Sequence, residues 1–402
     1  MGFRPMLSAL LRNKTGPLLV ALQIAVTLAI VINSLFIILQ RVEKMNRPTG
    51  IDVDNVLVVY VRGFGADFDV VASIGNDIDL IKSIPGVVNA TVANQVPLSG
   101  SGSATGLRSV PDETIDAIAT GRYRWSVDGL DALGVELARG RNFYPEEVDY
   151  VLPASNPRAP PSVLVTQALA DAFFPGEDAL GKTLYWGSME PSTIVGIIGH
   201  MHGSWVSWDK LDNIVVQPGN PAFGTNKYIV RTEPGMRDQL LPVIEEKLAA
   251  SNRMRVINRV RTLEELAANS YRMDRGMAVI LGIVISLLIS LTALVIVGLT
   301  SFQVARRRKQ IGTRRALGAT RLHIVREFML ENWLVTTAGA LLGAALTVCV
   351  AYWLETAFEL PRLDWRYLPA GIGILWLLST LAVIEPARRA AAVPPAVATR
   401  SV

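Results

Sequence analysis

Four long apolar segments limit most strongly how this chain can fold. Residues 18–39, 277–300, 328–354 and 368–384 are almost free of charged side chains, within a chain that is half apolar and only 18% charged. A helix rises about 1.5 Å per residue, so each segment can cross a hydrocarbon core of about 30 Å, the last only barely. The first run is too long for a secretory signal peptide, and no signal-type cleavage site follows it. We therefore predict four transmembrane helices.

The basic residues between these segments predict the orientation, because lysine and arginine favour cytoplasmic loops. The most basic loop lies between the second and third segments and contains Arg306, Arg307, Arg308, Lys309, Arg314, Arg315, Arg321 and Arg326. Residues 301–327 are therefore expected in the cytoplasm, together with both termini, residues 1–17 and 385–402. Residues 355–367 form a short external loop, and residues 40–273 lie in the periplasm or outside the cell. The basic flank of the first segment (Arg41, Lys44 and Arg47) would not by itself have decided this.

The large segment 40–273 has a mixed α and β pattern. Two β-α-β units are predicted, with strand, helix and strand at 56–61, 70–84 and 87–96, and at 227–231, 236–250 and 254–260. The residues between the two units are expected to form a second lobe. The predicted fold class is therefore an α+β membrane protein: four transmembrane helices, with a large two-lobed extracytoplasmic α+β domain inserted between helices 1 and 2.

A helix is expected to join this domain to the second span. Thr262 and Glu265 have capping-box spacing, and the apolar positions that follow lie on one helical face as far as Met273. We expect this helix to enter the span without a break, since a break in lipid would leave backbone groups unsatisfied. Such a helix would transmit motion between the domain and the membrane.

The stretch PGEDALGKTL has the spacing of a phosphate-binding loop, at Gly176, Gly181, Lys182 and Thr183. A phosphate-binding loop needs a buried strand before it and a helix that begins at its lysine. Here the order is reversed, because residues 168–174 have helical spacing and residues 182–186 have the character of a strand. We therefore expect a structural turn, and no ATPase in this chain.

The stretch from Phe302 to Asn332 is the most informative. Gly318 is expected to end a short basic helix, and Thr320 can cap the next helix. Charge alone leaves two interpretations open: a helix attracted to anionic lipid, and a docking element for a cytoplasmic partner.

Several motifs carry a resemblance to a known family. QIGTRRALGATRLHIVREFMLEN, residues 310–332, resembles the RREIGIRRALGA and TRxxIxxxFLxE motifs of the FtsX/MacB-like permeases of ABC transporters. The tail PARRAAAVPPAVATR is similar to the closing PAxRAAxxxPAEALR of that family. GVELARGRNF (134–143), VTQALADAFFPGEDALGKTL (165–184) and STIVGIIG (192–199) resemble the MacB-type periplasmic core domain. The resemblance covers nearly the whole chain.

The resemblance implies a permease subunit at the bacterial inner membrane, which converts ATP hydrolysis by separate cytoplasmic ABC ATPase subunits into movement of the extracytoplasmic domain. The expected process is export or efflux of a periplasmic substrate. ATP and magnesium would bind the partner ATPase, so no cofactor is expected in this chain. A second permease subunit, identical or related, completes the dimer, and family members often act with a membrane fusion protein and an outer-membrane channel. The lipid bilayer is the remaining partner, and no nucleic acid is expected.

The resemblance also identifies residues that would contact the ATPase. They match the family's coupling helix and are Gln310, Ile311, Gly312, Arg314, Arg315, Ala316, Leu317, Gly318 and Ala319. Gln310 stands where the family usually has glutamate, and the tail has Val397 and Thr399 where the family prefers glutamate and leucine. These departures leave a mixed pair of permeases open.

Two pairs of small residues are candidates for close helix packing. Gly339 and Gly343 lie in the third span, and Ser286 and Ser290 lie in the second. Both pairs have the spacing that lets helices approach closely. Contact between subunits and packing within the chain both stay open.

The remaining polar candidates are weaker. His200 and His202 could place two imidazoles together near Asp209 or Asp212, but we identify no third ligand at convincing spacing and expect no metal site. Glu331 at the edge of the third span is expected to reach the membrane interface, with proton relay as the alternative.

Two other classes of function remain as alternatives. A membrane-anchored extracytoplasmic sensor would signal inward, although the chain shows no kinase or other signalling domain. A secondary transporter would need broken helices and ion-binding carboxylates near the midplane, and neither is evident. The substrate has no motif of its own.

Overall fold

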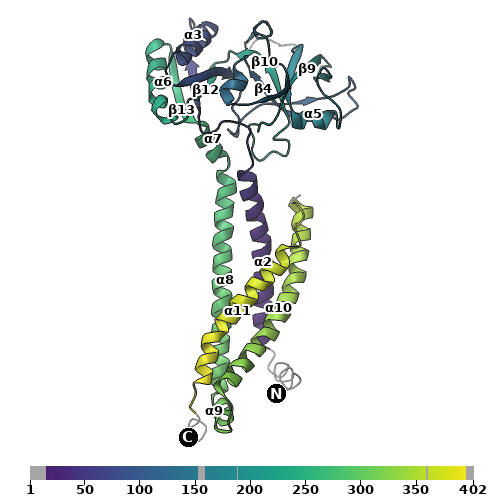
Figure 1. Ribbon diagram of the computed structural model, residues 1–402, viewed down its shortest axis with the longest axis vertical. Helices are drawn as coiled ribbons and strands as arrows, with labels where there is room; N and C mark the ends of the chain where they lie inside the picture. Colours follow the sequence, from purple (N-terminus) through teal and green to yellow (C-terminus); the bar gives the residue numbers. More distant parts are fainter. Residues whose placement is uncertain (1–14, 153–158, 188, 359–360, 395–402) are drawn as a thin grey trace. The chain divides into compact units, whose positions relative to one another are not determined.

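The computed structural model describes residues 15–152, 159–187, 189–358 and 361–394 (Figure 1). The chain forms two compact units: the α+β domain, Arg47–Met273, and the helical unit formed by the residues on either side of it. Residues 1–14 of the expected cytoplasmic segment and Val397 and Thr399 of the tail lie outside the described residues.

The helical unit contains four helices that are long and apolar enough to cross a membrane: α2 (Thr15–Met45), α8 (Arg272–Arg306), α10 (Arg321–Phe358) and α11 (Tyr367–Ala391). They confirm the four helices of the predicted fold class. A fifth, short helix, α9 (Arg308–Ala316), lies between α8 and α10 in the sequence.

Helix α2 is the most enclosed of the four. Half of its most apolar window is buried, against 11% for α8, and Figure 1 shows α10 running alongside α2. Polar side chains tie α2 to two neighbours: the Thr27 and Thr292 hydroxyls are 2.9 Å apart, and the Asn33 amide donates to the Thr347 carbonyl oxygen at 3.3 Å. The helix that begins the unit therefore holds the other helices together.

The basic residues that follow the first apolar segment have an acidic partner. The Arg41 guanidinium pairs with the buried carboxylate of Asp274, and the Lys44 ammonium lies 3.6 Å from the same carboxylate. This pairing lowers the net positive charge at this end of α2. It is the same basic flank that, taken alone, would not have decided the orientation of the first span.

The first lobe of the α+β domain is a four-stranded antiparallel sheet of β1 (Val56–Gly63), β2 (Val87–Ala93), β12 (Thr225–Thr232) and β13 (Arg255–Thr262). The order is β13-β1-β12-β2. Both predicted β-α-β units are present, with helices α3 (Val70–Lys82) and α6 (Arg237–Ser251), but they are interleaved, because β12 of the second unit lies between β1 and β2 of the first.

Alternation along β1 separates two cores. Leu57 and Val59 join a cluster with residues of α3 and α6, whereas Val56 and Val58 join a different cluster on the other face. This is the pattern expected of a strand covered on both faces, since successive side chains point to opposite sides.

The second lobe is a seven-stranded mixed sheet. Its members are β3 (Ala104–Leu107), β4 (Ile118–Trp125), β5 (Leu137–Gly140), β7 (Ser162–Thr166), β8 (Thr183–Tyr185), β9 (Pro191–Ile198) and β10 (Ile214–Pro218). The order is β3-β4-β10-β7-β9-β5, with β8 paired to β9. Short strands β6 (Tyr150–Val151) and β11 (Asn220–Pro221) form a separate pair.

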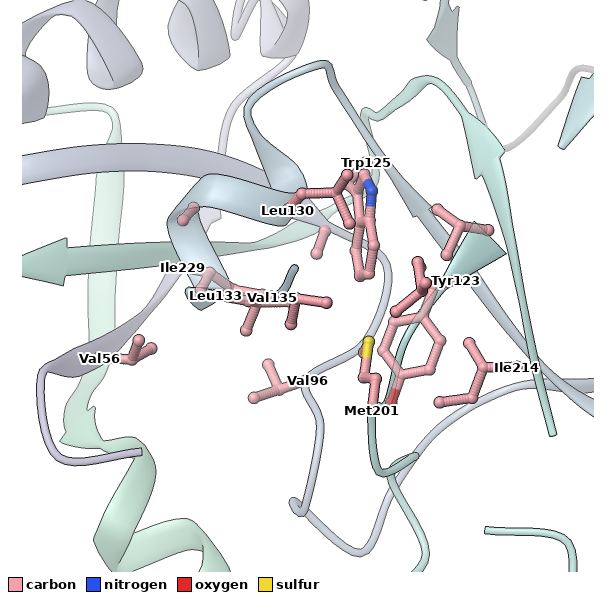
Figure 2. Close-up of a cluster of buried hydrophobic side chains, with 14 of the residues drawn as sticks. Val56, Val96, Tyr123, Trp125, Leu130, Leu133, Val135, Met201, Ile214 and Ile229 are labelled. Carbon is pink, nitrogen blue, oxygen red and sulfur yellow. The ribbon is translucent and has the colours of Figure 1, made fainter. Parts of the chain in front are cut away.

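One buried cluster joins the two lobes. Tyr123 and Trp125 of β4 pack with Leu133 of helix α4 (Gly129–Leu133), and Val56 and Ile229 of the first sheet belong to the same cluster (Figure 2). The predicted two-lobed α+β domain is therefore one body with a shared core.

The expected uninterrupted helix into the second span is not observed. Helix α7 (Leu263–Ser270) ends, and α8 begins at Arg272. The Ser270 hydroxyl donates to the Leu98 carbonyl oxygen at 2.6 Å, and Tyr271 is buried with φ −86° and ψ 3°. The Tyr271 N–H still donates to the Ala267 carbonyl oxygen at 3.0 Å, and the contact with Leu98 holds this end of α7 within the α+β domain. The prediction that relied on a continuous helix is wrong on this point.

The stretch that resembles a phosphate-binding loop is confirmed as a turn. It follows helix α5 (Gln167–Phe173) and precedes strand β8, in the reverse of the order that phosphate binding needs. Gly176 and Gly181 both have φ of +78°, a conformation that glycine adopts without strain. The Lys182 ammonium pairs with the Glu177 carboxylate and lies 4.4 Å from the centroid of the Phe174 ring.

Candidate functional site

The segment that was expected to couple to an ATPase is built around α9. The helix is followed by Gly318 with φ of +96°, and the Thr320 hydroxyl accepts a hydrogen bond from the His323 backbone N–H at 3.2 Å at the start of α10. The predicted glycine stop and threonine cap are therefore both observed.

One side of α9 is anchored in the helical unit. Ile311 and Gly312 are buried, and Ile311 packs in a cluster with Phe328 of α10 and Val383 and Ala387 of α11. Ala319 is half-buried against the same cluster.

Two of the expected docking arginines also act within the chain. Arg314 donates two hydrogen bonds to the Glu327 carboxylate, at 2.7 and 2.8 Å. Arg315 donates to the carbonyl oxygens of Ala391 and Val393 at the end of α11, at 2.9 and 3.1 Å. These contacts brace α9 against α10 and α11, so the two arginines position the helix whatever else they contact.

The other side of α9 is exposed. Gln310, Thr313 and Leu317 lie three and four residues apart and are all exposed, which places them on one helical face. Ala316 and Gly318 are exposed beside them. Leu317 has 83% of its surface exposed, the largest exposed fraction among the large apolar side chains of the described residues. We call Gln310, Thr313 and Leu317 the α9 face.

Glu331 is neither exposed at an interface nor isolated. The Arg307 guanidinium donates two hydrogen bonds to its carboxylate, at 2.8 and 3.1 Å, and the carboxylate side chain is only 9% exposed. This ion pair joins the residue before α9 to α10. It gives Glu331 a structural role within the helical unit, and its position relative to the membrane interface stays a prediction.

The two pairs of small residues lie in different surroundings. A Cβ added to Gly339 would lie 2.7 Å from the Ala21 carbonyl oxygen, and one added to Gly343 would lie 2.9 Å from the Ala25 Cα. Both glycines therefore pack against α2 within the chain. Ser286 and Ser290 are exposed on α8, and each hydroxyl donates to the carbonyl oxygen four residues before it. The α8 pair is thus on the side open to another molecule.

A second candidate site is a basic pocket in the α+β domain. A cavity of about 260 Å³ is lined by Asn94, Ser101, Gly102, Ser103, Arg122, Arg124, Phe223 and Lys227. None of its three cations forms a salt bridge with a carboxylate of the described residues. Instead they bond to neutral groups: Arg122 to the Ser103 hydroxyl at 3.0 Å, Arg124 to the Gln217 amide oxygen at 2.6 Å, and Lys227 to the Asn94 carbonyl oxygen at 2.7 Å.

The electrostatics of this pocket favour an anion. Burial, followed by repulsion from Arg122, lowers the pKa of Arg124 to about 10, and burial lowers the pKa of Lys227. Both pKa shifts indicate that burial makes the positive charges less stable here than in water, a cost that a bound anion would offset. The sequence carried a signal that we did not use. In GRYRW the tyrosine and tryptophan alternate with two arginines, so strand periodicity puts both arginines on the face away from the core.

Two protein-family models match the chain. Residues 18–246 match the family model described as MacB-like periplasmic core domain, and residues 282–395 match the model described as FtsX-like permease C-terminal. These matches confirm the resemblance predicted from the motifs. Neither model describes an ATPase.

Individual relatives are distant. The chain is 22% identical over 389 residues to the uncharacterized ABC transporter permease YknZ of Bacillus subtilis (strain 168), an alignment that covers 87% of this chain and 92% of YknZ. It is 26% identical over 274 residues to the macrolide export ATP-binding/permease protein MacB of Neisseria gonorrhoeae, over 65% of this chain but only 39% of that protein. The periplasmic region of MacB from Actinobacillus actinomycetemcomitans superposes with a TM-score of 0.35 and 15% identity, over 55% of this chain and 94% of that one.

Proposed function

Because the chain belongs to the MacB/FtsX-type ABC transporter permeases, we propose that it couples ATP hydrolysis by a separate cytoplasmic ATPase to movement of its α+β domain. The movement acts on a substrate outside the cytoplasm, for export or efflux. ATP and magnesium bind the partner ATPase, and this chain supplies no catalytic residue.

The proposed arrangement places α9 and both termini in the cytoplasm and the α+β domain in the periplasm or outside the cell. The support for this is the excess of arginine and lysine around α9. A second permease subunit, identical or related, pairs with this one at the bacterial inner membrane, and the exposed apolar side of α8 around Ser286 and Ser290 is the surface we propose for that contact. A membrane fusion protein and an outer-membrane channel are further proposed partners.

The α9 face carries the proposal. A partner that moves α9 must bind an exposed side chain of that helix. The helix must also be held rigidly against the rest of the unit, so that the movement is transmitted. The contacts of Ile311, Arg314 and Arg315 hold α9 rigidly against α10 and α11. The exposed Leu317 is the side chain that the partner would bind. Exposed apolar side chains beside charged ones are typical of protein contacts.

Replacing Leu317 with glutamate is expected to weaken binding of the ATPase about tenfold, because a buried apolar contact would become a desolvated charge. Leu317 is exposed, so the variant should fold as the native chain does. The measurement is the amount of ATPase that co-purifies with the chain in mild detergent, with the ATP hydrolysis of the same eluate.

The matched control is Ile115→Glu, which changes an exposed apolar residue of the α+β domain that is 46% exposed. It should leave the ATPase bound. If Leu317→Glu retains the native amount of ATPase, the α9 face is not the docking surface. If even the native chain brings no ATPase, or brings a signalling protein, the sensor alternative gains support instead.

The basic pocket suggests the chemistry of the substrate. We propose that the substrate carries an anionic group, a carboxylate or a phosphate, that binds among Arg122, Arg124 and Lys227. A charge-assisted hydrogen bond contributes about 1.5–3 kcal/mol, so Arg124→Gln should weaken binding of the anion by about tenfold or more.

The affinity for the anion is measured by calorimetric titration of the full chain with inorganic phosphate and with acetate. Lys210→Gln, at an exposed lysine of the same domain, is the control, and equal affinities of the native and Arg124→Gln chains would exclude the pocket.

A further inference from the structure

Three side chains of the α+β domain converge where the sequence showed only two. His200 and His202 follow β9, and Asp212 precedes β10. One ligand atom from each lies within 4.8 Å of the other two. Asp209, the other carboxylate considered from the sequence, is exposed and is not part of this group. Asp212 is therefore the carboxylate that lies with the two histidines, which sequence spacing alone did not identify.

The backbone explains why the third ligand is Asp212. The Gly203 N–H donates to the Leu211 carbonyl oxygen at 2.9 Å and closes the loop 203–211. His202 directly precedes Gly203 in the sequence and Asp212 directly follows Leu211, so the two side chains flank the base of the loop. Ten residues of separation in the sequence thereby become a contact of 3.4 Å between His202 Nε2 and Asp212 Oδ1.

Asp212 Oδ1, the carboxylate oxygen that faces His202 Nε2, is buried and lacks a hydrogen-bond partner among the described residues. The contact of 3.4 Å between His202 Nε2 and Asp212 Oδ1 is too long to be a good hydrogen bond. Unsatisfied buried polar atoms are rare in native proteins, and an ion bound at the site is one of the usual reasons.

His200 is oriented as a ligand would be. Its Nε2 lies 2.7 Å from the Pro48 carbonyl oxygen, and because a carbonyl can only accept, His200 must donate from Nε2. The neutral ring then has its lone pair on Nδ1. A backbone carbonyl that fixes the tautomer in this way is the usual support for a metal-binding histidine.

The donor set selects the ion. Zn²⁺ binds histidine nitrogen and carboxylate oxygen at about 2.0–2.2 Å in a tetrahedron, whose edges are therefore about 3.3 Å. The contact between His202 Nε2 and Asp212 Oδ1 has this length. Ca²⁺ and Mg²⁺ prefer six or more oxygen ligands, which one carboxylate and two imidazoles do not provide.

From these contacts we propose that His200, His202 and Asp212 form a binding site for Zn²⁺, with water as the fourth ligand. The ion would clamp the base of the loop 203–211, which carries Trp205 and Trp208, to the segment at Pro48 where the chain enters the domain. The site is independent of ATPase coupling.

Arg47 is the cation that acts on His202 from the segment next to Pro48. The positive charge of Arg47 works against any cation here, so the site is expected to bind zinc reversibly.

The test is the zinc content of the purified full chain, prepared in detergent with a tag that contains no histidine. After equilibration with micromolar zinc and removal of the excess, the native chain should hold one zinc per chain by mass spectrometry of the metal. Asp212→Asn and His200→Ala should each lower the affinity more than tenfold, as losing a ligand costs at least as much as losing its support. Excess Mg²⁺ or Ca²⁺ should not compete.

The chain offers a clean control, because its only other histidine is the exposed His323 at the start of α10. His323→Ala should bind zinc as the native chain does. A second readout is hydrogen exchange across residues 203–212, which zinc should slow in the native chain and leave unchanged in Asp212→Asn. Zinc content no higher in the native chain than in the double variant Asp212→Asn/His200→Ala would overturn the proposal.

Discussion

Replacing Gly339 with leucine is expected to separate α10 from α2 and to destabilise the helical unit strongly. An added Cβ alone would lie 2.7 Å from the Ala21 carbonyl oxygen and 2.9 Å from the Ile24 Cβ, both closer than real Cβ contacts. The nearest of these atoms is backbone, which cannot turn aside as a flexible side chain can. The whole leucine side chain can enter only if the two helices move apart.

The cost follows from what α2 does in the unit. Overpacking a close contact costs about 1–3 kcal/mol and sometimes more, and here it also removes the polar ties that need the same closeness, such as Asn33 to the Thr347 carbonyl oxygen. Folded proteins are stable by only about 5–15 kcal/mol. We therefore expect most of the variant to aggregate or be degraded, measured as the fraction that elutes as a single species after extraction into detergent.

Gly373→Leu is the matched control. It makes the same change in another membrane-spanning helix, α11, where an added Cβ would meet no described atom within 4 Å. This control should elute as the native chain does. Gly339→Leu could instead elute normally and no longer crosslink to a second permease. In that case the glycine pair contacts another subunit, and packing against α2 is not the reason that glycine is needed at these positions.

The comparison of sequence and structure shows which features are local. The end of α9 and the start of α10 were predicted because Gly318 and Thr320 act on their own backbone neighbours. The turn at Gly176 was predicted because the order of helix and strand is visible in the pattern. The break at Tyr271 was not, since it depends on a hydrogen bond from Ser270 to Leu98, a residue far away in the sequence.

The contacts of the candidate sites could not be predicted for the same reason. Arg315 was chosen for its charge, but its partners are carbonyl oxygens at the end of α11, which sequence spacing does not connect to it. Asp212 joins the two histidines only because a backbone bond closes the loop between them. Residue types and periodicity thus predicted the elements and their ends, whereas the partner of each polar side chain depends on tertiary packing.

Arg255→Met is expected to destabilise the α+β domain by about 3–5 kcal/mol, the usual cost of leaving one partner of a buried ion pair uncompensated. The Arg255 and Asp77 side chains are 0% and 3% exposed and form an ion pair. Arg255 also donates to the Leu248 carbonyl oxygen at 3.1 Å, and Tyr228 donates to Asp77 at 2.7 Å.

This network joins two strands of the first sheet, β12 and β13, to the helices α3 and α6. Burial, followed by the charge of Asp77, raises the pKa of Tyr228, so its hydroxyl keeps its proton and remains a donor to the carboxylate. Without Arg255 the Asp77 carboxylate retains only that hydrogen bond and a weaker one from Ser73 at 3.4 Å. Two neutral donors cannot compensate the buried negative charge of Asp77 as the Arg255 guanidinium does, because water does not reach this carboxylate.

The double variant Arg255→Met/Asp77→Leu separates this explanation from a simple loss of packing. Removing both charges should restore most of the stability, since apolar replacements of buried ion pairs are often neutral or stabilising. The surface pair of Arg237 and Glu264, 3.0 Å apart with the glutamate 61% exposed, is the control, and breaking it should cost less than about 1 kcal/mol. The measurement is hydrogen exchange of β12 and β13 in the full chain. If the double variant is as unstable as Arg255→Met, the loss comes from the shape of the arginine side chain, and the buried charge of Asp77 is not its cause.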